Sequence, residues 1–292
     1  MTSPVNGQWA VDSHAHIIDT ARFALCNPAG YVPQANECGT AHEFRTVLAA
    51  HGMTHALLVN PFAGYGTDNR CMLDAIAGSD GRFKGIALVG HDTNESTFQA
   101  LADGGVIGAR FNTLFSGATS LKGSEGAKLL ARVRDQGWFA QVYFHDDALL
   151  DLLPILDAAR VRVVVDHCGC PDPSRGVDQP GFQALLELGR RGEAVIKLSG
   201  AFRYSAQSWP YADGEPFVEA LIDAFTLDRC VWGSDWPFVR VAHRMDYGPV
   251  QALLERWLPD AADRRRVLWD TPARCFGFDT PTHPDRPEPT HA

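Results

Sequence analysis

The sequence predicts an α/β fold, a (β/α)8 barrel. Its 292 residues suit one such barrel, which typically needs about 250 residues. Short apolar segments alternate along the chain with longer amphipathic stretches, as repeated βα units require. The first β-rich segment ends in His-Ala-His, and not in the glycine-rich phosphate loop that usually follows the first strand of an open, doubly wound sheet. These three observations together favour a closed TIM barrel.

Each strand of the barrel has a candidate segment in the sequence. The expected strands are residues 9–16, 55–60, 83–89, 107–111, 138–145, 161–167, 194–198 and 230–233. Amphipathic helices are expected between them, among others at 43–50, 126–136, 149–159, 182–190 and 217–224, and after the last strand at 247–257, 261–269 and 272–276. We expect one catalytic barrel domain over residues 8–278. The polar, proline-rich segment 279–292 has no apolar periodicity and is expected to be a disordered tail.

Composition and charge exclude several classes of protein. The formal net charge of −9 leaves no basic stripe for a nucleic acid. The first residues lack the basic and apolar regions of a signal peptide, and no apolar run approaches the ~18 residues of a membrane span. The seven cysteines are odd in number and form no CxxC pair. We therefore expect a cytoplasmic protein with reduced thiols and with no membrane or nucleic-acid partner, whether it is a monomer or a homo-oligomer.

Polar side chains collect at the ends of the expected strands. The active site of a (β/α)8 barrel lies at the carboxyl ends of its strands. These ends carry His14 and His16, Asn60, Arg110 and Asn112, His145, His167 and, after the last strand, Asp235. A scaffold without chemistry would show more mixed and smaller residues there, so the strand ends predict a reaction centre.

The two histidines of the first strand share one face. Residues two apart on a strand point the same way, so His14 and His16 are expected to face the barrel mouth together. Two imidazoles at this spacing suit a divalent metal or a pair of hydrogen-bond donors to a carbonyl. A pair of surface or core histidines fits an isolated His-x-His equally well. His145 either reaches the mouth as well or begins the solvent-exposed loop.

Two other motifs are more specific. A continuous apolar strand ends in VVVDHCGCPD and delivers His167 at its end. In RCVWGSDWPF, Asp235 follows the last strand between two tryptophans, where partial desolvation would tune its pKa for proton transfer. A helix N-cap is the alternative for Asp235. For Cys168 and Cys170, core packing is favoured over metal binding.

As a set, VDSHAH, DHCGCPD and VWGSDWP resemble the motifs of the amidohydrolase superfamily, amidohydrolase 2 type. More closely, the chain is similar to the lactonase branch typified by 2-pyrone-4,6-dicarboxylate lactonase. The likeness spans residues 11–278 and includes GARFN, QVYF and KLSGAFR. It implies a hydrolase that opens a carboxylated lactone, of the 2-pyrone-4,6-dicarboxylate, sugar-acid or muconolactone type, as in the breakdown of aromatic acids.

The resemblance also implies roles for single residues. Asp235 would take a proton from water and pass it to the leaving oxygen, while His14, His16 and His167 polarise the lactone carbonyl. Arginines are suited to binding a carboxylate through two hydrogen bonds, and imidazole donors can stabilise an oxyanion. The expected substrate-binding residues are Arg110, Arg203 and Tyr143, together with Asn60, Asn112 and Tyr31 at the mouth.

The chain departs from the family pattern at two positions. Relatives that hydrolyse the pyrone dicarboxylate carry a second arginine shortly after RFN, where RFNTLFSG has Ser116. This favours a substrate with less negative charge or with a differently placed carboxylate. The superfamily often bridges two metals with a lysine after strand four, and Arg110 stands there, so no binuclear site is expected. We expect no obligatory metal; one Zn²⁺ or Mn²⁺, if bound, would be held by His14, His16, Asp235 and His145.

Two other activities fit the same motifs. A metal-dependent decarboxylase of an aromatic acid would bind stoichiometric Zn²⁺ or Mn²⁺ and release CO2. A lactone isomerase would move an acyl group between hydroxyls of a sugar acid and release no acid. A binding protein without catalysis would leave Asp235 and the histidines unexplained.

Overall fold

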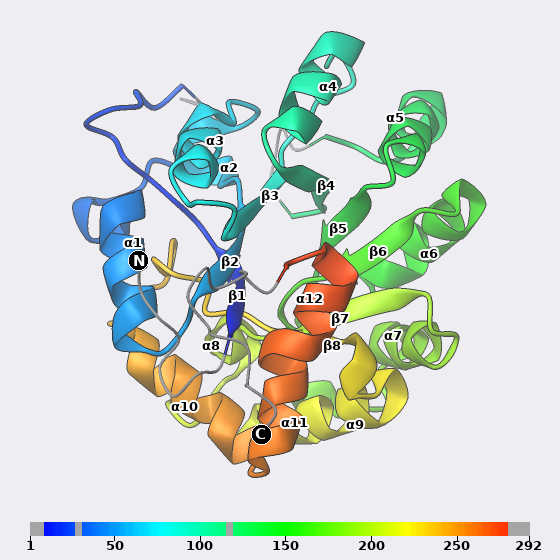
Figure 1. The fold of residues 1–292 in the computed structure, drawn as a ribbon. Helices are drawn as coiled ribbons and strands as arrows, with labels where there is room; N and C mark the ends of the chain where they lie inside the picture. The colour runs from blue at the N-terminus through cyan, green and yellow to red at the C-terminus, as the bar shows by residue number, and fades with distance from the viewer. Residues whose placement is uncertain (1–8, 27–30, 115–118, 280–292) are drawn as a thin grey trace, which may run out of the picture.

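The computed structural model describes residues 9–26, 31–114 and 119–279. Eight parallel strands pair in chain order and form a nearly closed barrel with helices between them, so the predicted (β/α)8 fold is confirmed (Figure 1). The strands are β1 (Val11–Ala15), β2 (His55–Val59), β3 (Phe83–Ala87), β4 (Val106–Asn112), β5 (Phe139–Tyr143), β6 (Arg162–Val165), β7 (Ala194–Leu198) and β8 (Cys230–Trp232).

The helices alternate with the strands. They are α1 (Ala41–Ala50), α2 (Phe62–Tyr65), α3 (Arg70–Ala77), α4 (Glu95–Asp103), α5 (Gly123–Asp135), α6 (Ala148–Ala159), α7 (Pro180–Arg190), α8 (Ala201–Tyr204), α9 (Glu215–Phe225), α10 (Tyr247–Trp257), α11 (Ala261–Arg265) and α12 (Thr271–Phe276). The helix expected at 261–269 changes at Arg266–Asp270 to a π-helical turn. Among the described residues, no helix is long and apolar enough to span a bilayer.

Strand β6 ends earlier than the sequence predicted, and this difference affects the position of His167. The strand expected at 161–167 ends at Val165. The Asp166 N–H still donates to the Val142 carbonyl of β5, and His167 begins a 3-10 turn over His167–Gly169. His167 takes a left-handed φ of 50° there. The chain thus turns at the point where its polar side chains begin. The predicted tail beyond residue 279 and Ser116 lie outside the described residues.

Apolar side chains fill the barrel and leave one end polar. Inside the strands lie Leu57, Ile86 and Val164, each fully buried. The last helix α12 crosses the amino-terminal end of the barrel (Figure 1), where Phe276 packs edge-on against Phe139. The opposite, carboxyl end of the strands is therefore the end at which polar groups gather.

The barrel closes between β1 and β8 through residues just beyond the end of β8. The backbone N–H of His16 donates to the Trp236 carbonyl at 2.7 Å, and that of Asp235 donates to the His14 carbonyl at 2.8 Å. Asp12 lies buried under this junction. Its carboxylate accepts from the N–H groups of His14 (3.1 Å) and Ser234 (2.9 Å) and from the Tyr247 hydroxyl (3.0 Å).

The Asp12 carboxyl should leave a pH signature on stability. Its burial raises the pKa to about 6, above the value in the unfolded chain, so its stabilising effect is complete at low pH and is lost as the pH rises through about 6. We expect Asp12→Asn to remove this dependence. The unfolding free energy of the wild type relative to the variant should fall between pH 4 and 6 by up to roughly 3 kcal/mol. Urea unfolding at a series of pH values checks this, and a constant difference contradicts it.

Candidate active site

One cavity opens at the carboxyl end of the barrel. Its polar lining residues are His16, Arg110, Tyr143, His167, Arg203, Asp235 and Arg240. Pro61, Phe62 and Ala63, after β2, and Val239, after β8, complete the wall. His14 lies directly below the cavity and is fully buried. The structure thus brings His14, His16, His167 and Asp235 together, as the sequence predicted for their positions.

Asp235 is the centre of this arrangement. Its Oδ1 lies 3.3 Å from Nε2 of His16 and 3.7 Å from Nε2 of His14, and its Oδ2 lies 3.5 Å from Nε2 of His167. The guanidinium of Arg203 donates from Nε to Oδ2. Oδ1 has no hydrogen-bond partner, so one oxygen of the carboxylate is oriented by Arg203 and the other is left for chemistry.

The surroundings keep the carboxyl of Asp235 charged and the rings of His14 and His167 neutral. Burial alone would raise the pKa of Asp235, but Arg203 and the histidines more than offset it and hold the pKa well below its usual range. Burial lowers the pKa of His167 to about 3, and burial with the nearby Lys197 lowers that of His14 as well. At neutral pH a charged Asp235 therefore faces the neutral rings of His14 and His167.

Unusual backbone conformations aim these side chains. Asp235 and His167 both have left-handed φ angles, 65° and 50°, which cost about 1–3 kcal/mol each in a non-glycine residue. Gly200, with φ of 66°, lies against the His167 ring, and a Cβ there would stand 2.6 Å from His167 Nδ1. The Ser199 hydroxyl lies 3.0 Å from the same nitrogen. The sequence Ser-Gly after β7 thus fixes the ring of His167.

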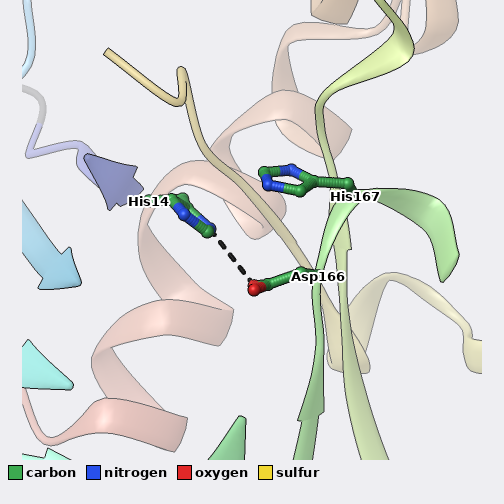
Figure 2. A group of neighbouring side chains, drawn as sticks. All are labelled: His14, Asp166 and His167. Atoms are coloured by element: carbon green, nitrogen blue, oxygen red, sulfur yellow. Dashed lines mark ion pairs between the residues drawn. The ribbon is translucent and has the colours of Figure 1, made fainter. Parts of the chain in front are cut away.

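A second layer of buried charge lies beneath the cavity. Asp166 Oδ2 accepts hydrogen bonds from Arg110 Nε and Gln141 Nε2, both at 3.0 Å. The ammonium of Lys197 lies 3.2 Å from Asp166 Oδ1. Burial would raise the pKa of Asp166, but Lys197, His14 and Arg110 hold it well below the usual range. Figure 2 shows His14 of β1 beside Asp166, with Nδ1 3.2 Å from Asp166 Oδ1, and the His167 ring next to it.

Sequence reasoning missed this layer as a functional group. Lys197 is the one charged residue in the apolar segment AVIKL of β7, and its side chain is fully buried. A charge within an apolar strand was the available signal, because buried lysines need partners. Gln141 shares a face with Tyr143 on β5, and Asp166 adjoins His167. Their mutual contacts join three strands and could not be read from any one of them.

Arg110 and Tyr143 form one wall of the cavity. The guanidinium carbon of Arg110 lies 5.2 Å from the centre of the Tyr143 ring, a cation–π contact. The Tyr143 hydroxyl lies 3.0 Å from Nε2 of His145. His145 is therefore linked to the cavity through Tyr143 and is not among the residues that line it.

Three expected substrate-binding residues have other contacts. Asn60 donates to the carbonyls of Gly66 and Asp68 and so holds the loop after β2. Asn112 accepts from the Leu114 N–H and borders a neighbouring cavity. The Tyr31 hydroxyl bonds to Glu37 at 2.7 Å. In the described part of the chain, none of these three lines the cavity around Asp235.

Glu37 and Arg240 join two loops at the mouth, and neither was expected from the sequence. The buried carboxylate of Glu37 accepts from the Tyr31 hydroxyl, from the Gln34 N–H at 2.8 Å and from the Arg240 N–H at 2.6 Å. The Arg240 guanidinium lies 5.1 Å from the Tyr31 ring centre. A third arginine thus lines the cavity with Arg110 and Arg203.

The amidohydrolase-type motifs raise the question of a metal. His14, His16 and Asp235 offer atoms within 4.8 Å of one another. His16 suits a cation, because its Nδ1 must donate to the Val59 carbonyl (2.7 Å) and its Nε2 therefore presents a lone pair. His14 fits less well, because its Nδ1 lies 3.1 Å from the ammonium of Lys197, which can only donate.

The remaining candidate ligands do not complete the site. The second group, His14, Asp166 and His167, has its carboxylate already paired with Lys197 and Arg110. His145, Cys168 and Cys170 belong to neither group among the described residues. The side chains that could hold a metal are present, and their fit to one is incomplete.

The chain is similar over most of its length to several proteins named for acting on lactones. The chain is 30% identical to a 4-sulfomuconolactone hydrolase of Hydrogenophaga intermedia, over 93% of this chain and 89% of that one. It is 31% identical to a D-galactarolactone isomerase of Agrobacterium fabrum, over 94% and 93% of the two chains. A solved structure from Acinetobacter baumannii, assigned as a 2-pyrone-4,6-dicarboxylic acid hydrolase with citric acid bound, is 30% identical with a TM-score of 0.82, over 92% and 99%.

A more distant amidohydrolase from Burkholderia multivorans, solved with zinc bound, shares the fold at 21% identity and a TM-score of 0.72, over 93% of this chain and all of that one. The model of the family described as amidohydrolase matches residues 11–278, which are also the limits of the likeness found in the motifs. The chain is an enzyme that belongs to the amidohydrolase family.

Proposed function

We propose that this enzyme is a hydrolase that opens a carboxylated lactone by adding water to the ring carbonyl. The proposal rests mainly on the position and charge of the Asp235 carboxylate. It lines the cavity, is ionised at neutral pH, and keeps Oδ1 without a hydrogen bond among three imidazoles. Relatives named as lactone hydrolases over nine-tenths of the chain support the same reaction.

The geometry suits general-base attack by water. Water donates one proton to Asp235 Oδ1 while its oxygen bonds to the carbonyl carbon. Imidazole N–H donors below the carbonyl stabilise the oxyanion that forms. The C–O bond of the ring then breaks, and Asp235 returns the proton to the leaving oxygen. The product is a carboxylic acid with a free hydroxyl, or with its keto tautomer if the leaving oxygen is enolic.

The cavity favours an anionic substrate. Arg110, Arg203 and Arg240 line it, where Arg203 is paired with Asp235 and Arg110 with Asp166. Arg240 reaches the cavity from the loop after β8. The second arginine that pyrone-dicarboxylate hydrolases carry after the RFN motif, which this chain lacks, would follow β4 instead. We therefore propose a substrate with a second acidic group placed towards Arg240. The related structure from Acinetobacter baumannii was solved with citric acid, a polycarboxylate, bound, which supports an anionic substrate.

Two alternatives are less well supported. An isomerase would use the same arginines and histidines, and a relative named D-galactarolactone isomerase is 31% identical; acid release in a pH-indicator assay separates it from a hydrolase. A decarboxylase needs a metal to chelate its substrate, and the fit of His14 to a metal is incomplete.

Replacing Asp235 tests the reaction. Asp235→Asn keeps the shape of the side chain and removes the base, so turnover of carboxylated lactones should fall by at least about 100-fold. A pH-indicator assay over a panel of such lactones, with and without a chelator, measures it. Circular dichroism should show a retained fold. Asp147→Asn, at a half-buried carboxylate after β5 that is paired with Arg175, is the matched control and should retain activity. An active Asp235→Asn variant contradicts the assignment.

Replacing Arg240 tests the substrate class. Arg240→Gln should raise the KM for lactones with two acidic groups by about tenfold, since a hydrogen bond to a charged group is worth about 1.5–3 kcal/mol and solvent weakens it at the rim. The KM for lactones with one acidic group should change little, and so should kcat. Arg244→Gln, on the same loop and paired with Asp246, is the control. An equal change in KM for both substrate classes contradicts a role in recognising the second group.

A further inference from the structure

Lys197 takes no part in the reaction just described, although it lies directly below the cavity. Its side chain is fully buried. Nζ has two hydrogen-bond acceptors, Gln141 Oε1 at 2.8 Å and His14 Nδ1 at 3.1 Å, and an ion-pair contact with Asp166 Oδ1 at 3.2 Å. An ammonium has three N–H donors and no acceptor. Each neighbour must therefore present a lone pair to Lys197.

Gln141 meets this requirement because its amide orientation is fixed. Its Nε2 donates to Asp166 Oδ2 at 3.0 Å, which turns Oε1 towards Lys197. The orientation of Gln141 thus agrees with both of its buried partners, and only the position of the proton on His14 remains to be determined.

The contacts of His14 determine that position. Its Nδ1 is within hydrogen-bond geometry of Lys197 Nζ, so Nδ1 accepts and the proton of the neutral ring lies on Nε2. In the competing arrangement Nδ1 would donate to Asp166 Oδ1, 3.2 Å away. Asp166 Oδ1 makes no hydrogen bond, however. The direction from Nδ1 therefore matches the lysine and not the carboxylate.

We propose that Lys197 is a positioning residue that holds His14 in its Nε2–H form, so that His14 donates a hydrogen bond into the cavity and is prevented from binding a divalent cation. His14 Nε2 has no hydrogen-bond partner within the protein, which leaves its proton for a substrate oxygen. The same proton removes the lone pair that a metal would need. The buried Lys197 thus makes His14 a hydrogen-bond donor, in a group of residues that could otherwise hold a cation.

Removing the lysine should reverse this choice. In Lys197→Met, Nδ1 of His14 has only Asp166 as a partner and should donate to it. Nε2 then turns a lone pair towards the cavity and joins His16 Nε2 and Asp235 Oδ1, whose atoms lie within 4.8 Å of one another. A histidine whose other nitrogen donates to a carboxylate is the usual form of a metal ligand.

The first experiment determines which ring nitrogen of His14 carries the proton in the wild-type enzyme. Selective ¹⁵N labelling of histidine distinguishes Nδ1–H from Nε2–H by NMR, and His14→Gln assigns the His14 signals by their loss. We expect Nε2–H in the wild type and Nδ1–H in Lys197→Met. A wild-type His14 in the Nδ1–H form overturns the proposal, even if the variant does not fold.

The second experiment measures zinc binding to chelator-treated enzyme by calorimetry. Lys197→Met should bind Zn²⁺ about 10- to 100-fold more tightly than the wild type. Lys197→Arg, which keeps a donor, should resemble the wild type. Gln141→Leu removes a partner of Lys197 without removing the donor to His14, so its zinc affinity should stay at the wild-type value.

Equal zinc affinity in the wild type and Lys197→Met overturns the proposal, as does an increase that Gln141→Leu reproduces, since loosening of the site would then explain it. Neither experiment uses a substrate. The proposal for Lys197 can therefore be wrong while the proposal of lactone hydrolysis is right. Equally, the proposal for Lys197 can be right while that of lactone hydrolysis is wrong.

Discussion

The junction between β1 and β8 is the constraint on which the active site depends. His14 lies on β1 and His16 directly after it, near the start of the chain, while Asp235 follows β8 more than two hundred residues later. Two backbone hydrogen bonds across the junction set these segments side by side. Asp12 fixes the junction from below by joining β1 to Ser234 and Tyr247. Closing the barrel and assembling the imidazole–carboxylate centre are thus one structural event.

Buried charge is the second constraint, because an isolated carboxylate in the barrel would be protonated or would destabilise the fold. The protein meets it with two layers. Asp235 is paired with Arg203 at the cavity, and Asp166 is paired with Arg110 and Lys197 beneath it. In the proposed reaction, each pair also orients a group that acts on substrate. Stability and positional accuracy in this region therefore rest on the same contacts.

The barrel and the central residues could be predicted from the sequence, and their neighbours could not. Strand periodicity and strand ends locate His14, His16, His167 and Asp235, because backbone position alone brings such residues to the mouth. Backbone position does not fix where a side chain points. Asn60, also at a strand end, turns back to hold its own loop.

The contacts that sequence reasoning missed are those between segments distant in the chain. Lys197 meets Gln141 and His14 across the barrel, and Arg240 meets Glu37 across the mouth. Their recognition requires the closed barrel, since no periodicity within one segment reports a partner in another. A charge inside an apolar strand was the one local sign of such a contact.

The left-handed backbone at His167 and Asp235 carries a consequence for laboratory evolution. Selection for heat resistance will favour replacing residues in strained conformations by glycine or asparagine, which adopt them at less cost. Here that selection would act on the two turns that aim the imidazole and the carboxylate. If these two residues act as proposed, gains in thermal tolerance obtained at these turns will reduce catalytic performance, whereas helices on the outer wall can be stabilised without this conflict.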